Sequence, residues 1–269
     1  MDRAITHADY APRYLSGIGA EIGAHSSPIS GISPIYVDKF SEYDGVACLA
    51  DYPGEATALP FFSNSLDYVA SSHVFEHLAN PVKALVEWQR VLKPGGHAYL
   101  VVPDRRYTFE HARETTAAEH MIGDYLANVD DNDTTHIDEF VYGIDWEQIT
   151  PGLSAQELKA QQKANAAYHH DRAAQGLEVN IHFHVFEPTN FKTLIELCNA
   201  STQVPVNMEL IAIEERFPEP HLNGFLAVLR TTKSPLSRLS ASLSKARKLT
   251  GAASEYPLDK SRLGTFKQS

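Results

Sequence analysis

The sequence predicts an α/β fold, in which a doubly wound, mostly parallel, seven-stranded sheet carries a helical cap insertion. Short apolar segments alternate with loops and helical patterns between residues 17 and 102, as in parallel sheets. Within this stretch a helical pattern begins at Pro81, and a Pro-Gly-Gly turn at residues 94–96 ends it just before the apolar segment 97–102. A helix that leads through a tight turn into a buried strand is one crossover of a parallel sheet.

The strands follow from the apolar segments in chain order. We expect them at residues 18–22, 35–37, 46–49, 66–70, 98–102, 207–213 and 224–229. A helix from Pro188 to about Ala200 precedes the last two strands, which are joined around residues 218–220. Residues 105–180 interrupt the alternation with polar, acidic sequence that favours a helix at 155–174, so we interpret them as a cap over the carboxyl edge of the sheet.

Length and charge limit the organisation and the partners. The 269 residues suffice for one sizeable core with a smaller appendage, divided here into a core (1–104 and 181–230), a cap (105–180) and a basic, Ser-rich tail (231–269). The net charge is −11 although the tail is basic, so the body repels phosphates and nucleic acid is not expected as a substrate. The tail is interpreted as a solvated extension or as a weak helix for an anionic surface or a partner.

Targeting signals and cysteines point to the cytoplasm. No apolar run is long enough to span a bilayer, and no signal-peptide pattern begins the sequence, so no membrane segment is expected. Cys48 and Cys198 are far apart in the sequence and form neither a disulfide framework nor a CxxC metal motif. Such sparse cysteine use is typical of a reducing compartment. We therefore expect a cytoplasmic protein.

Several segments resemble a known enzyme family. The sequence of residues 67–69, 76–81 and 88–96 resembles the region after the fourth strand in class I S-adenosyl-L-methionine (SAM) methyltransferases. Residues 102–109, 119–121 and 181–186 resemble a bacterial subgroup of that family with a mid-chain insertion. The resemblance spans residues 18–229 and implies SAM as the cofactor. It further implies methyl transfer to a heteroatom, a hydroxyl group, of a small metabolite or sugar.

The resemblance also implies the cofactor-binding residues. Residues 21–27 resemble the family pattern E-x-G-x-G-x-G, although only the first glycine is present. The strand that ends at residue 38 would place a carboxylate where it accepts both ribose hydroxyls. For the adenine side the sequence leaves two acidic residues open, and two residues after the fourth strand would lie near the sulfur. The predicted set is Glu21, Gly23, Ala24 and His25 for the methionine end, Asp38 and Lys39 for the ribose, Asp51 or Glu55 for adenine, and Ser72 and His73 for the sulfur.

Three residues are candidates for the acceptor side. Asp104 follows the fifth strand, where it would orient an acceptor hydroxyl or take its proton. His182 and His184 would face the same side if they lie on a strand. A neutral imidazole accepts the proton that an attacking hydroxyl loses, and we prefer His184 as this base because it lies nearer the resumed core. No metal ligand is assigned.

Other functions remain as alternatives. Residues 73–77 also spell H-x-x-E-H, the zinc pattern of inverzincin proteases, but here the pattern lies inside a βαβ unit, so a protease is rejected. A divalent cation at His73, Glu76 and His77, a metal-dependent hydrolase and a non-catalytic SAM-binding module stay open. A nicotinamide oxidoreductase is disfavoured, because the glycines at 17, 19 and 23 do not complete the dinucleotide pattern in either frame.

Overall fold

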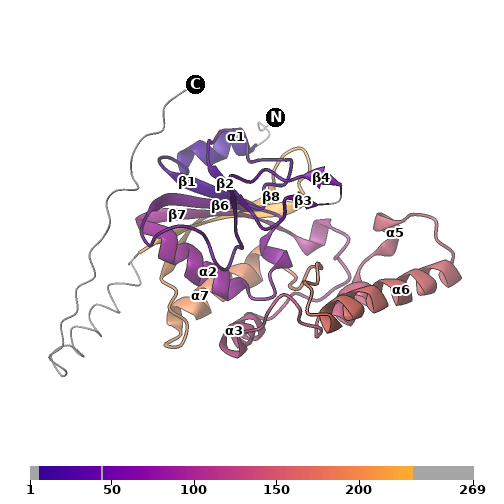
Figure 1. The fold of residues 1–269 in the computed structure, drawn as a ribbon. Coiled ribbons are helices and arrows are strands. Elements are labelled where there is room, and N and C mark those ends of the chain that lie inside the picture. Colours follow the sequence, from indigo (N-terminus) through magenta and orange to yellow (C-terminus); the bar gives the residue numbers. More distant parts are fainter. Residues whose placement is uncertain (1–5, 44, 233–269) are drawn as a thin grey trace. The chain divides into compact units, whose positions relative to one another are not determined.

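The fold is a seven-stranded sheet with helices packed on it and a helical cap at one end (Figure 1). The computed structural model describes residues 6–43 and 45–232, so nearly all of the predicted tail lies outside the described residues. The strands are β1 (Gly19–Ile22), β2 (Ile35–Asp38), β3 (Glu42–Tyr43), β4 (Val46–Ala47), β5 (Tyr52–Pro53), β6 (Leu66–Ser72), β7 (Leu92–Pro103), β8 (Met208–Phe217) and β9 (Gly224–Thr231).

Most of the helices lie in one run between β7 and β8. The α-helices are α1 (His7–Tyr10), α2 (Pro81–Val91), α3 (Ala118–Ala127), α4 (Ile137–Gly143), α5 (Trp146–Ile149), α6 (Ala155–Ala174) and α7 (Pro188–Ala200). Three short 3₁₀ helices, η1 (Ala11–Arg13), η2 (Phe75–His77) and η3 (Arg105–Tyr107), complete the elements. The helices predicted from Pro188 and at residues 155–174 are therefore confirmed. Among the described residues, no helix has both the length and the apolar character that crossing a membrane requires.

The sheet confirms the predicted fold class. Its order is β5-β2-β1-β6-β7-β9-β8; the first five strands are parallel, and β9 is antiparallel to both β7 and β8. The strand predicted at residues 46–49 is present only at Val46–Ala47, and its predicted place in the seven-stranded sheet is wrong. Val46 is exposed and pairs with Tyr43 in a separate hairpin, while β5 takes the sheet edge beside β2.

Helix α2 is the best-predicted crossover. The side chain of Asn80 caps it by accepting a hydrogen bond from the Lys83 amide at 3.0 Å, and Pro81 occupies the first turn, where its missing N–H costs nothing. Trp88 is fully buried and donates to the Ala56 carbonyl at 2.9 Å. The Pro-Gly-Gly turn lies within the span of β7. It forms an irregularity in the pairing with β6, since Leu66 pairs with Leu92 but Tyr68 pairs with His97.

The two faces of the sheet are covered unequally. Alternate side chains of β7 enter two different cores, as the period of a strand requires: Leu100 joins the core packed by α2, α3 and α7, while Tyr99 joins the core packed by α1 and η1. Residues 23–34 contain no helix, although a helix usually makes the crossover between neighbouring parallel strands. A loop takes its place on the thinly covered face.

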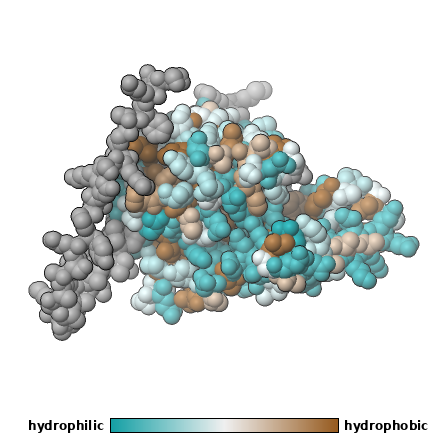
Figure 2. All heavy atoms as spheres, in the orientation of Figure 1, coloured by the Kyte–Doolittle hydropathy of each residue, from teal (hydrophilic) through white to brown (hydrophobic). Residues whose placement is uncertain are grey.

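The cap has a small core of its own. Val141, Trp146 and Phe183 are buried together with Ala79 of the sheet domain. Trp146 donates to the Val141 carbonyl at 2.7 Å, which closes the turn between α4 and α5. Helix α6 is largely exposed, and hydrophilic residues predominate over this part of the surface in Figure 2. The cap is thus held through α4, α5 and the segment that returns to α7.

A buried carboxylate holds the loop that replaces the missing helix. Glu21 is 1% exposed, and its Oε1 accepts a hydrogen bond from the Ile29 amide at 2.9 Å. The other oxygen, Oε2, is buried without a hydrogen-bond partner. Burial raises the pKa of Glu21 to about 7, although the hydrogen bond from Ile29 opposes the shift. Ionising this side chain therefore costs more in the folded protein than in the unfolded chain.

This raised pKa predicts a pH-dependent stability. Stability should fall as the pH rises from about 4.5, the unfolded value, to about 7, because only the unfolded chain ionises freely there. A shift of this size corresponds to a loss of up to about 3 kcal/mol. Glu21→Gln should remove this loss, as measured by urea unfolding of both proteins at pH 4.5 and pH 8. An equal pH dependence in the variant would contradict the prediction.

Candidate active site

A cavity opens at the carboxyl ends of the parallel strands. Its volume is about 220 Å³, far more than a packing defect or a single water requires. Ile22, Gly23, Asp38 and His73 contribute from strand ends of the sheet, and Asn180 contributes from the cap. Ligands of open α/β sheets bind at this edge, so the cavity is the candidate binding site.

The loop after β1 keeps a glycine-like backbone despite its few glycines. Gly23 has φ +67°, and a Cβ there would lie 2.6 Å from Cγ2 of Val74, so glycine is required for both reasons. His25 stands at the second glycine position of the family pattern and also takes a left-handed φ of +48°. Histidine is among the residues that tolerate this region. Both residues line the cavity, as predicted for the methionine end.

Asp38 lies at the end of β2 with its carboxylate at the cavity. The residue is 7% exposed, and Oδ1 accepts a hydrogen bond from the Phe40 amide at 2.9 Å, which fixes the side-chain orientation. An oriented carboxylate at a strand end is the arrangement that accepts ribose hydroxyls. The ribose-binding role of Asp38 stays a prediction.

Lys39 links the sheet domain to the cap. Its Nζ lies 3.3 Å from Oδ2 of Asp131 and 2.5 Å from Oε1 of Glu178, and all three residues line the cavity. Burial lowers the pKa of Lys39, but the two carboxylates outweigh this effect and raise it. The charge of Lys39 is therefore used to hold the cavity wall together.

On the adenine side the geometry favours one of the two predicted carboxylates. Glu55 lines the cavity, whereas Asp51 is exposed, lies outside the lining and accepts a hydrogen bond from the Tyr36 amide at 2.9 Å. Phe40 and Tyr43 add aromatic walls that the sequence reasoning missed. Tyr43 lies on the β3–β4 hairpin and accepts a hydrogen bond from Asn180 Nδ2 at 2.7 Å, a contact that no local pattern indicates.

A buried carboxylate and three imidazoles meet beside the cavity. Glu76 is fully buried, and its Oε1 lies 3.6 Å from Nδ1 of His73 and 3.9 Å from Nε2 of His77. His182 packs on His77 with ring centroids 4.5 Å apart and bonds Glu110 through Nδ1 at 2.7 Å. His73 and His77 line the cavity. His73 has φ +54°, an uncommon backbone conformation that often marks functional positions.

These neighbours set the charges of the cluster. Burial alone would raise the pKa of Glu76, but the interaction with His73 and the charges of His77 and His182 lower it to about 2. Burial lowers the pKa of His73, yet the Glu76 carboxylate outweighs it and raises that pKa above 6.5. Burial, together with the charge of His182, lowers the pKa of His77 to about 4. Near neutral pH, Glu76 is ionised and His77 is neutral.

None of the three acceptor-side candidates is among the residues that line the cavity. His182 and His184 do not lie on a strand, and they join different clusters, so the expectation that they face one side together is wrong. His184 is fully buried outside the cavity lining, where burial lowers its pKa to about 3. Asp104 is also fully buried outside the lining, and Arg106 binds both of its oxygens at 2.6–3.1 Å.

Three further predicted cofactor residues lie outside the lining. Glu21 turns toward the opposite face of the sheet and binds Ile29, as described above. Ala24 and Ser72 are not among the lining residues either. Of the predicted cofactor set, the cavity therefore brings together Gly23, His25, Asp38, Lys39, Glu55 and His73.

Part of the chain matches a known protein family. Residues 37–100, which run from the end of β2 to β7, match the family described as a methyltransferase domain. The strand order, with its antiparallel closing pair, is that of class I methyltransferases. This part of the chain is similar to a methyltransferase domain, and the sheet has the class I methyltransferase fold.

Individual curated proteins are similar in sequence to short segments of this chain. A ubiquinone/menaquinone biosynthesis C-methyltransferase of Ruegeria sp. is 34% identical over 99 residues, which cover 36% of this chain and 38% of that protein. A demethylmenaquinone methyltransferase of Renibacterium salmoninarum is 54% identical over 43 residues, which cover 16% of this chain and 18% of that protein. The chain thus spans well under half the length of these curated relatives.

Solved structures resemble the chain over a greater length. A SAM-dependent methyltransferase of Thermotoga maritima, described as a possible histamine N-methyltransferase, has a TM-score of 0.45 at 15% identity. The alignment covers 85% of this chain and 88% of that one.

The residues of the cavity fit SAM, the cofactor of the methyltransferases that this chain resembles. Gly23 lets the backbone approach the ligand where a side chain would clash with Val74. The Asp38 carboxylate offers the acceptor that two ribose hydroxyls need, and Phe40 and Tyr43 offer apolar surface for a base. The lining carboxylates also suit the positive charge of a sulfonium.

The position of Asp38 predicts its effect on cofactor affinity. Asp38→Asn should weaken SAM binding by about 1–3 kcal/mol, because a charge-assisted hydrogen bond to the ribose is lost. Isothermal titration calorimetry measures this change. Asp51→Asn is the matched control, because this carboxylate lies outside the cavity, and it should leave the Kd unchanged. Equal affinities for Asp38→Asn and the wild type would remove Asp38 from the site.

Proposed function

We propose that this methyltransferase domain transfers the methyl group of SAM to a heteroatom, a hydroxyl oxygen of a small metabolite or sugar. The observation that supports it best is the pair formed by His73 on the cavity wall and the buried Glu76 behind it. An oxygen nucleophile must lose its proton as it is methylated. A histidine oriented by a carboxylate is suited to accept that proton.

The pair divides the roles between its two members. Nδ1 of His73 faces Glu76, which leaves Nε2 to accept the proton of an acceptor in the cavity. Glu76 orients the ring and stabilises the imidazolium that forms. Bound SAM supplies an activated methyl group on its sulfonium. His73 replaces His184 as the proposed base, and His182 supports the site from behind His77.

The cap would complete the acceptor pocket. Asp131, Glu178 and Asn180 contribute cavity walls from the segment that we assign to the cap, and Lys39 holds two of them. A closed wall excludes water and aligns the acceptor with the cofactor. We accordingly propose the division into a core (1–104 and 181–230) and a cap (105–180). The free cysteines Cys48 and Cys198 support a reducing, cytoplasmic location.

Carbon methylation is the second candidate. The relatives described above include a C-methyltransferase. The family match, however, ends at residue 100, before the segment that contributes the cap-side walls. The match therefore includes Asp38, Glu55 and His73 but leaves the cap-side walls of the acceptor pocket undetermined.

The test offers SAM with a ¹³C-labelled methyl group to a panel of small hydroxyl compounds, sugars and quinol rings. Mass spectrometry detects the product, and the chemical shift of the labelled carbon separates a methyl ether from a C-methyl group. A methyl ether is the expected result, whereas a C-methyl product would replace it with the second candidate. SAM binding without any product would favour a non-catalytic binding module.

The His73–Glu76 pair predicts a pH profile. Turnover should rise with pH through the raised pKa of His73, because only the neutral imidazole accepts a proton. Glu76→Gln removes the charge that raises this pKa, so the rising limb should move to lower pH. The groups facing His73 include the His7 imidazole, whose own pKa falls to about 4 mainly through burial. The pH dependence of kcat measures the shift.

Removing the imidazole of His73 gives a second test of its proposed role as the base. His73→Ala should lower kcat by about 10²–10⁴-fold while the Kd for SAM stays within about threefold. His111→Ala removes a cap imidazole outside the cavity and should leave both values unchanged. Normal turnover in His73→Ala would move the base elsewhere.

A further inference from the structure

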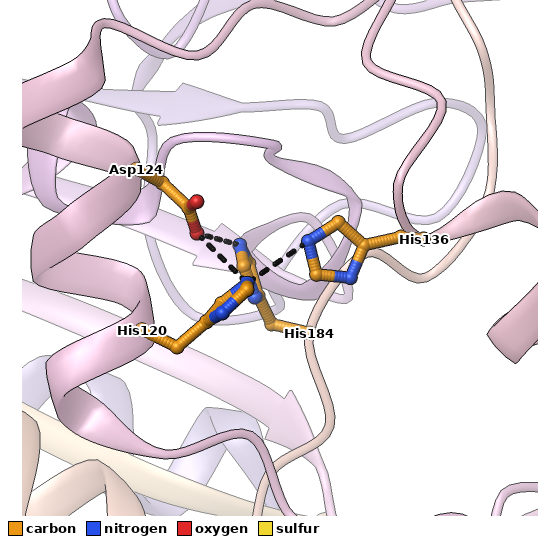
Figure 3. Close-up of side chains that lie close together, drawn as sticks. All are labelled: His120, Asp124, His136 and His184. Atoms are coloured by element: carbon orange, nitrogen blue, oxygen red, sulfur yellow. Dashed lines mark hydrogen bonds and ion pairs between the residues drawn. The ribbon is translucent and has the colours of Figure 1, made fainter.

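A second group of chemically active side chains lies outside the SAM cavity. The His120 cluster consists of His120, Asp124, His136 and His184. His120 and Asp124 lie one turn apart on α3, His136 directly precedes α4, and His184 lies on the segment that leads to α7. Figure 3 shows the four side chains converging on one point. None of the four lines the cavity.

The distances within the His120 cluster match the edges of a coordination tetrahedron. Nε2 of His120 lies 3.2 Å from Nε2 of His136 and 3.4 Å from Oδ2 of Asp124. The same oxygen lies 3.7 Å from Nε2 of His184, and one ligand atom from each of the four residues falls within 4.8 Å of the others. Zinc–ligand bonds of about 2.0–2.1 Å place two tetrahedral ligands about 3.3–3.4 Å apart.

The cluster also leaves polar atoms unsatisfied. Oδ2 of Asp124 is buried and has no hydrogen-bond partner. The Nε2 atoms of His120 and His136 face each other, so at most one of them donates a proton to the other. Nε2 of His184 has the Ala79 carbonyl as a partner at 3.3 Å and would exchange this contact for the cation. A cation at the centre would bind the orphaned oxygen and the facing nitrogens together, which removes the cost of burying them unpaired.

An outer layer of charge supports one of these ligands. Nδ1 of His136 lies 3.6 Å from Oε2 of Glu139, and Oε1 of Glu139 accepts a hydrogen bond from Arg113 at 3.2 Å. Metal-binding histidines commonly have a carboxylate against the second ring nitrogen, which fixes the tautomer that leaves the other nitrogen free. His136 and Glu139 have this arrangement.

We propose that the His120 cluster binds one Zn²⁺ ion in a closed, structural site. Three imidazoles and one carboxylate are ligands that Zn²⁺ accepts in tetrahedral geometry. Four protein ligands leave no open position for a substrate, so the ion acts by connecting elements. It joins α3, the start of α4 and the segment before α7. The site is independent of methyl transfer and of the proposed acceptor.

The experiment uses the full chain and Zn²⁺ or Co²⁺ as the probe. After dialysis against a chelator, Zn²⁺ should bind at one equivalent per chain and raise the Tm. Co²⁺ should give the intense visible bands of a tetrahedral ion. A chain that takes up neither ion stoichiometrically, or a Co²⁺ spectrum of octahedral weakness, would overturn the proposal.

Two variants locate the site. The His120 side chain is 47% exposed, so His120→Ala removes one ligand with little effect on packing. Zn²⁺ affinity should fall by more than the roughly 10–100-fold that loss of an outer-shell partner costs. His170→Ala, which removes a similarly exposed imidazole from α6, should bind Zn²⁺ as the wild type does. Asp124→Asn provides an isosteric repeat, and undiminished binding by both ligand variants would refute the site.

Discussion

The buried charge of Glu76 is the constraint around which the site is organised. A carboxylate with no solvent exposure needs positive or hydrogen-bonding neighbours, because an isolated buried charge is very unfavourable. His73 and His77 from the segment after β6, and His182 from the segment returning from the cap, surround this carboxylate and lower its pKa, although neither of its oxygens has a hydrogen-bond partner. The main-chain carbonyl of Glu76 also accepts a hydrogen bond from the Phe183 amide at 2.9 Å. The segments that precede and follow the cap therefore meet at Glu76, beside the cavity.

The charge network extends from there through the cap. His182 bonds Glu110, Glu110 pairs with the buried Arg113 at 2.5 Å, and Arg113 reaches Glu139 beside His136. Buried ion pairs add little net stability, but breaking one of them leaves an uncompensated charge. The network thus fixes how the cavity wall and the His120 cluster are arranged within the cap. Lys39 makes a second connection at the cavity, where it holds two cap carboxylates.

The thinly covered face of the sheet explains where the sequence departs from the family pattern. With no helix after β1, the loop has to be held by other means, and the Glu21 carboxylate does so through the Ile29 amide. His25 then adopts the left-handed backbone that a glycine would take more easily. The strand predicted at residues 46–49 lies outside the main sheet, because Val46 is exposed on the β3–β4 hairpin. Apolar character alone does not show which sheet a strand joins.

The sequence by itself determined the parallel sheet, the α2 crossover and the strand-end positions of Gly23, Asp38 and His73. These features follow from local periodicity, and parallel strands bring their carboxyl ends to one edge whatever the loops do. Only the tertiary structure decided between Asp51 and Glu55, separated His182 from His184, and gathered the His120 cluster. Those outcomes depend on irregular segments and on long-range packing between the cap and the core. The local sequence pattern does not indicate such long-range contacts.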